Sequence, residues 1–129
     1  MSALTIQRLL ASVFFLLGGW ALFFPDSVIA LGVNEPYRSG SYLETLLMAC
    51  FGAQACIAGT FAWFSRFTKA SFIAYGVVLL PFFVFNYWFT IREPVLNSLM
   101  LADLAGNVVM LGLCYLGWKK APRRLVAAD

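Results

Sequence analysis

Residues 42–64, YLETLLMACFGAQACIAGTFAWF, decide the fold. The run is almost wholly apolar, and its charged residue, Glu44, stands close to one end. An α-helix needs about 20 such residues to cross the hydrocarbon core of a bilayer. This stretch therefore predicts a membrane-spanning helix.

Three further runs of the same kind lie on either side of it, at about residues 5–24, 70–90 and 95–118. Hydrophobic residues make up 62% of the chain and charged residues 12%, with a mean hydropathy of +0.84. An average soluble domain has roughly 45–50% apolar and about 25% charged residues. We therefore expect residues 1–129 to form a single all-α domain, an integral membrane four-helix bundle.

The positions of the basic residues predict how the chain lies in the membrane. Cytoplasmic loops are enriched in lysine and arginine. Placing the N-terminus inside leaves Arg38 and Arg92 outside, and it puts all the other basic residues in the cytoplasm: Arg8, Arg66, Lys69, Lys119, Lys120, Arg123 and Arg124. The expected topology has both termini in the cytoplasm.

Several classes of function are disfavoured by what the sequence lacks. There is no histidine, the commonest general base and metal ligand. The three cysteines, Cys50, Cys56 and Cys114, form no CxxC pair. We therefore expect no metal, no cofactor and no catalytic residue. Because the basic residues stand at the borders of the spans, the expected partner is membrane lipid and not nucleic acid.

Polar residues inside the spans suggest a site. Asp103 and Asn107 are spaced i, i+4 and share a helix face, and a charge at the centre of a span costs on the order of 2.5–3.5 kcal/mol on insertion scales. Counting from Val95 at 1.5 Å per residue places Asp103 roughly 12 Å deep. We expect an outward-facing pocket with an aromatic rim, and its candidate ligand-binding residues are Glu44, Asn86, Tyr87, Trp88, Arg92, Asp103 and Asn107. The alternative is that Asn86, Asp103 and Asn107 only hold helices together, with Arg92 neutralising Asp103.

A stripe of small residues runs along the second span, and small residues allow two helices to approach closely. It consists of Ala49, Gly52, Ala53, Cys56, Gly59 and Thr60. Gln54 points about 150° away from it. The stripe contacts either a neighbouring helix of the same bundle or a partner, which could be another copy of the chain or a larger membrane complex.

The layout resembles that of DoxX-like and related four-helix proteins of the bacterial inner membrane. The residues that carry the resemblance are Trp20 to Pro25, Gly32, the Phe51-Gly52 pair and Asp103. The resemblance implies an accessory subunit in a bacterial inner membrane.

These observations favour a non-enzymatic small membrane protein. It would bind a lipid-like or small hydrophobic molecule in the outward-facing pocket, or it would serve as an accessory subunit of a membrane complex. The alternative is a proton-coupled small transporter or a lipid-modifying membrane enzyme that uses Asp103 and Glu44.

Overall fold

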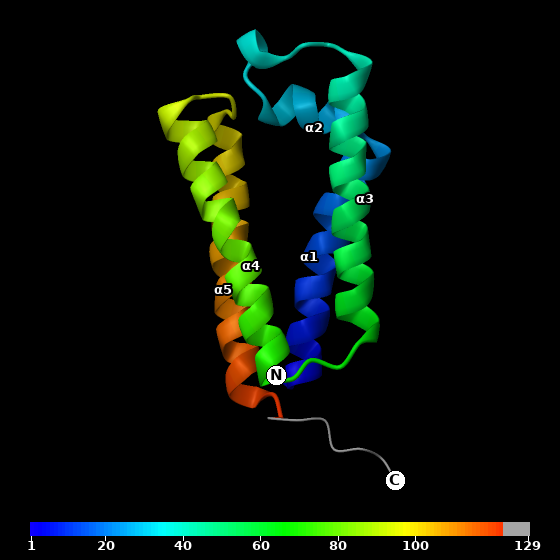
Figure 1. Ribbon diagram of the computed structural model, residues 1–129, viewed down its shortest axis with the longest axis vertical. Helices are drawn as coiled ribbons and strands as arrows, with labels where there is room; N and C mark the ends of the chain where they lie inside the picture. Colours follow the sequence, from blue (N-terminus) through cyan, green and yellow to red (C-terminus); the bar gives the residue numbers. More distant parts are fainter. Residues whose placement is uncertain (123–129) are drawn as a thin grey trace.

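The computed structural model describes residues 1–122 (Figure 1). Arg123 and Arg124, which the orientation argument uses, lie outside the described residues. Helices dominate the described part of the chain, in the order α1 (Ala3–Phe23), α2 (Pro25–Gly32), η1 (Glu35–Tyr37), α3 (Tyr42–Phe64), α4 (Lys69–Tyr87), η2 (Trp88–Arg92), η3 (Ser98–Met100) and α5 (Leu101–Lys120). Of the short elements, η1 and η3 are 3-10 turns and η2 is a π-helical turn.

Four helical segments are long and apolar enough to cross a membrane: Ala3–Phe23, Tyr42–Phe64, Lys69–Arg92 and Ser98–Lys120. Their mean hydropathies are 1.6, 1.5, 1.8 and 1.8. Within residues 1–122 the structure thus confirms an all-helical fold with four helices of membrane-spanning length.

Three of these helices begin after a hydroxyl residue that caps them. The side-chain oxygen of the cap accepts a hydrogen bond from the backbone amide three residues on, which satisfies a donor that the helix leaves free. The caps are Ser2, Ser41 and Thr68. Each helix begins directly after its cap. The second span therefore starts where it was predicted to start, and the first and third spans begin two residues and one residue earlier than predicted.

The fourth span begins later than predicted, because residues 94–97 pair with the loop that follows α2. The Asn34 amide N–H donates to Val95 O at 2.8 Å, and the Asn97 N–H donates to Gly32 O at 2.9 Å. Asn97 Oδ1 then accepts from Leu99 N and caps η3. Asp103 consequently lies in the first turn of α5, nearer the helix end than the predicted depth of about 12 Å.

The helices are arranged as two pairs. Helix α1 packs along α3, α4 packs along α5, and the pairs meet through α1 and α5. Figure 1 shows that the pairs come together at the end that holds the N-terminus and stand apart at the end that holds α2. Lys120 Nζ donates to Met1 O at 2.8 Å, so the last turn of α5 lies beside the start of the chain. We call this the terminal end, and the other the loop end.

The apolar core lies in the half of the molecule near the terminal end. Its most deeply buried large side chains are Ile6, Leu10 and Phe72. Toward the loop end, large apolar side chains of α1 such as Leu16 and Phe23 are exposed. The four helices therefore pack as one bundle only near the termini.

Candidate functional site

A buried polar cluster joins α4 to α5 near the loop end. Phe72, Leu79 and Asn86 are buried at seven-residue spacing on the face of α4 that packs on α5. On α5, Asn107 is also buried, one turn after Asp103. On each helix, the face that packs against the other is therefore apolar near the terminal end and polar near the loop end.

The Asp103 carboxylate is the centre of this cluster. Its Oδ2 accepts hydrogen bonds from Asn86 Nδ2 at 3.0 Å and from Asn107 Nδ2 at 2.9 Å. The structure therefore brings together three of the predicted site residues, including the i, i+4 pair on α5. The two amides neutralise none of the carboxylate charge, but they supply two donors to one of its oxygens.

The orientation of the Asn86 amide follows from its neighbours. Asn86 Nδ2 also donates to Phe82 O at 2.9 Å, so both of its contacts are acceptors. Turning the amide over would place Oδ1 against two oxygens. The Asn86 Oδ1 atom must therefore point elsewhere, and it is buried without a hydrogen-bond partner among the described residues.

A second unpartnered polar atom lies one helical turn further along. Thr90 Oγ1 is buried and also lacks a partner within the described part of the chain. A buried polar atom that loses its partner costs about 1–3 kcal/mol. Two such atoms, four residues apart in the chain, are therefore unusual, and the amide oxygen of Asn86, which can only accept, lacks a hydrogen-bond donor.

The backbone at Thr90 is irregular. Thr90 belongs to η2, a π-helical turn in which Glu93 N–H donates to Trp88 O at 2.8 Å. π-helical turns are rare and frequently occur at functional sites. The irregular turn thus contains one of the two unpartnered atoms, and the other, on Asn86, lies two residues before the turn begins.

The rim residues take positions different from those expected. The Arg92 guanidinium lies over the Trp88 ring, 4.2 Å from its centre, in place of the expected contact with Asp103. Tyr87 and Trp88 are exposed, and they follow Asn86 directly in the chain. Tyr87 and Trp88 thus lie next to the cluster in the chain, and Arg92 is engaged by Trp88 and not by Asp103.

Glu44 does not join the cluster. It lies in the first turn of α3, where its Oε2 accepts from Ser39 N at 2.9 Å, Ser39 Oγ at 2.7 Å and Gly40 N at 3.0 Å. At the loop end Figure 1 shows α3 well separated from α4 and α5. The expected convergence of Glu44 with Asp103 is thus corrected: the carboxylate of Glu44 holds the loop before α3.

A shallow hollow of about 230 Å³ lies beside Glu44 at the loop end, and Asp26, Arg38 and Thr45 also line it. Thr45 Oγ1 donates to Asp26 Oδ1 at 2.7 Å. The Arg38 guanidinium donates to Ala30 O at 2.7 Å. The first contact joins α2 to α3 and the second ties the loop before α3 back to α2, which accounts for these groups without a ligand.

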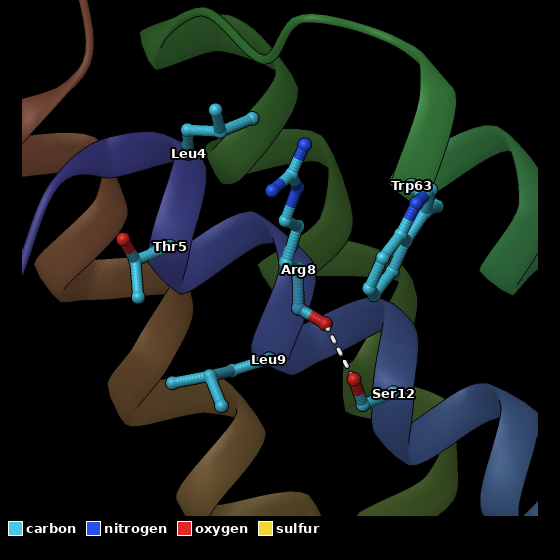
Figure 2. Close-up of a pocket in the computed structure, with 6 residues that line it drawn as sticks. All are labelled: Leu4, Thr5, Arg8, Leu9, Ser12 and Trp63. Atoms are coloured by element: carbon cyan, nitrogen blue, oxygen red, sulfur yellow. Dashed lines mark hydrogen bonds between the residues drawn. The ribbon is translucent and has the colours of Figure 1, made fainter.

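A second hollow, of about 220 Å³, lies at the terminal end between α1 and α3 (Figure 2). Figure 2 shows the Arg8 side chain beside the Trp63 ring, and the guanidinium lies 5.4 Å from the ring centre. Ser12 Oγ donates to Arg8 O at 2.9 Å. This hollow contains none of the predicted pocket residues.

The small-residue stripe of α3 faces α1. A Cβ added at Gly52 would lie 2.6 Å from Gly18 O and 2.7 Å from Ala21 C, and one added at Gly59 would lie 3.2 Å from Ala11 O. Ala49, Ala53 and Cys56 are half-buried, and Thr60 is exposed with its hydroxyl donating to Cys56 O. Packing within the chain therefore accounts for the two glycines, and no partner is needed to explain them.

Sequence reasoning missed two polar residues that the structure makes important. Thr90 could have been found, because it is spaced i, i+4 from Asn86. Gln7 gave no comparable signal: it is buried, donates to Ala62 O and Ser65 O at 2.6 and 2.7 Å, and accepts from Phe67 N at 3.0 Å. Its partners lie more than fifty residues away in the chain, so only the fold reveals its role as the cap of the C-terminal end of α3.

Comparison of this chain with protein-family models, with curated proteins and with solved structures found no match. The resemblance to DoxX-like proteins stays a prediction.

Proposed function

We propose that this chain is a non-enzymatic integral membrane protein that binds a lipid-like molecule at the loop end of the α4–α5 pair. The observation that carries the proposal is the buried Asn86 Oδ1 atom, which has no partner and lies beside Asp103. Buried polar atoms in native proteins are nearly always hydrogen-bonded, so this atom is best explained by a ligand that supplies a donor.

The proposed setting is a bacterial inner membrane with both termini in the cytoplasm. Arg8, Lys119 and Lys120 support this orientation, because they belong to the terminal end, where Lys120 contacts Met1. The loop end then faces outward, and the cluster lies in the outer half of the bilayer. A membrane lipid could reach it without entering water.

The chemistry of the cluster favours one kind of head group. Asn86 Oδ1 is an acceptor only, and the Asp103 carboxylate adds acceptor oxygens, while Thr90 Oγ1 can accept or donate. The one cation of the rim, Arg92, is stacked on Trp88. An alcohol or an amine supplies the missing donors, whereas a phosphate or carboxylate head would bring more acceptors and negative charge next to Asp103.

The proposal is tested by native mass spectrometry of the protein extracted gently from its own membrane. We expect a lipid-like adduct on the wild type that is lost in Asp103→Asn, because this change keeps the shape of the side chain but removes the charged acceptor. Glu44→Gln is the matched control, an acid-to-amide change at the loop end of the other helix pair, and it should keep the adduct. An adduct that survives in Asp103→Asn would contradict the proposed site.

The same two variants, together with an activity assay, separate the rival proposals. A transporter or lipid-modifying enzyme that uses Asp103 and Glu44 as a pair would lose its activity in both variants. Glu44 is bound by Ser39 and Gly40 on the other helix pair, which does not favour this rival. An accessory subunit would appear in the spectrum together with another protein and without a lipid adduct.

A further inference from the structure

Helix α3 presents a continuous exposed seam on the side that α1 leaves uncovered. The seam positions alternate in steps of four and three residues: Leu43, Leu47, Cys50, Gln54, Ile57, Phe61 and Phe64. All seven are exposed. This alternation is the a/d pattern of a left-handed coiled coil, in which two helices pack side by side along their length.

Gln54 occupies the middle of this seam. It is exposed, and its amide makes no hydrogen bond within residues 1–122. Gly52 and Gly59, on the opposite side of α3, are the residues that pack on α1. No other helix within residues 1–122 covers Gln54, although a polar amide in hydrocarbon requires a hydrogen-bond partner.

We infer that the seam is the interface between two copies of this chain. An amide carries both donors and an acceptor, so two Gln54 side chains related by a two-fold axis satisfy each other. The two copies insert in the same direction, so their α3 helices run parallel and equal positions meet. A single polar residue at an a position is the usual device that sets register and oligomer state in such a seam.

The inference rests on membrane insertion, because in water an exposed glutamine needs no partner. It is independent of the proposed ligand site, which belongs to the other helix pair. Loss of the interface should therefore leave the lipid adduct in place, and loss of the adduct should leave the interface in place.

Cys50 provides the first test. It is exposed and lies one helical turn from Gln54 on the seam, at a d position where equal residues of parallel helices are close enough for a disulfide. We expect oxidation with copper phenanthroline in native membranes to give a covalent dimer, with the oxidant accepting the two electrons of the new bond. Cys50→Ser should abolish the dimer, and Cys56→Ser, which changes a half-buried cysteine on the α1 side, should retain it.

Gln54 provides the second test, read as the dimer dissociation constant in detergent. Gln54→Leu should raise it about threefold to tenfold, the range of interhelical hydrogen bonds in membranes. Gln54→Asn keeps the amide and should restore most of the association. Thr60→Val, an exposed change at a position that flanks the seam without belonging to it, is the control for general effects of substitution on α3.

Three results would overturn the inference. The first is absence of a dimer crosslinked through Cys50 in membranes, and the second is an unchanged dissociation constant for Gln54→Leu. The third is a product in which Cys50 is joined to a different protein, because this would assign the seam to another partner.

Discussion

The two helix pairs are held together by different kinds of contact. Helices α1 and α3 approach each other backbone to backbone through Gly18 and Gly52, where there is no room for a side chain. Helices α4 and α5 are joined near the loop end by hydrogen bonds around Asp103. The first pair uses the smallest residues of the chain, and the second places a half-buried ionisable residue between two buried amides.

We interpret the difference between the two kinds of contact as a difference in role, structural for α1–α3 and functional for α4–α5. In membranes, close packing of small residues is a main source of helix association, whereas a hydrogen bond between helices contributes only about 0.6 kcal/mol on average. The Asp103 cluster is therefore a poor way to hold helices together, and it leaves Asn86 Oδ1 unpartnered. This contrast supports the proposal that α1–α3 is the scaffold and that α4–α5 carries the ligand site.

The largest expected effect is on the scaffold. Gly52→Ala should lower the free energy of unfolding by about 2–3 kcal/mol, the cost of overpacking a close contact, because its Cβ would lie 2.6 Å from Gly18 O. Unfolding in mixed micelles followed by circular dichroism measures the change.

Gly19→Ala is the matched control for this change. An added Cβ at Gly19 meets nothing within 4 Å. Because alanine favours a helix over glycine by about 1 kcal/mol, this variant should be as stable as the wild type or more stable. Equal losses in the two variants would show that the contact with Gly18 is not what holds α1 to α3.

A smaller loss is expected at Gln7, a polar residue that is buried in the scaffold. Gln7→Met should cost about 2 kcal/mol, because it leaves Phe67 N–H and the end of α3 without their partner. Gln54→Met makes the same change at an exposed position and should stay within about 0.5 kcal/mol for the monomer. The same unfolding assay, at a protein-to-detergent ratio that keeps the chain monomeric, compares them.

The smallest effect on stability is expected at the site. A double-mutant cycle of Asn86→Leu and Asp103→Asn should give a coupling energy of about 0.6 kcal/mol, as is usual for hydrogen bonds between membrane helices. A coupling of 2 kcal/mol or more would mean that the cluster holds α4 to α5, and the contrast between the two pairs would then fail.

The sequence predicts the spans well because each depends on local composition. Residues 42–64 are apolar between Ser41, which caps the helix, and Ser65, where it ends, so their bounds match the structure. The start of the fourth span was wrong because Asn34 and Gly32, more than fifty residues earlier, bind residues 94–97. Periodicity along one segment contains no information about such a partner.

The site was predicted only in part, because local spacing determines some of its contacts and distant neighbours determine the others. Asp103 and Asn107 share a face by spacing alone, and their hydrogen bond was predictable. Whether Glu44 or Asn86 completes the cluster depends on which helices are neighbours, and α5 pairs with α4 and not with α3. The sequence also gives no sign that the Asn86 oxygen lacks a partner, because this depends on the orientation of one amide.

The central claim is that the unpartnered acceptors of the α4–α5 pair bind a hydrogen-bond donor of a membrane amphiphile. Its most direct test is a native mass spectrometry titration of the detergent-solubilised wild type and Asn86→Leu with hexadecanol and with its methyl ether, in which a methyl group replaces the donor hydrogen; the ratio in Asn86→Leu corrects for the added methyl group. For the wild type we predict about tenfold tighter binding of the alcohol, equivalent to one buried hydrogen bond, and for Asn86→Leu a ratio near one. Equal binding of the alcohol and the ether to the wild type would contradict the account.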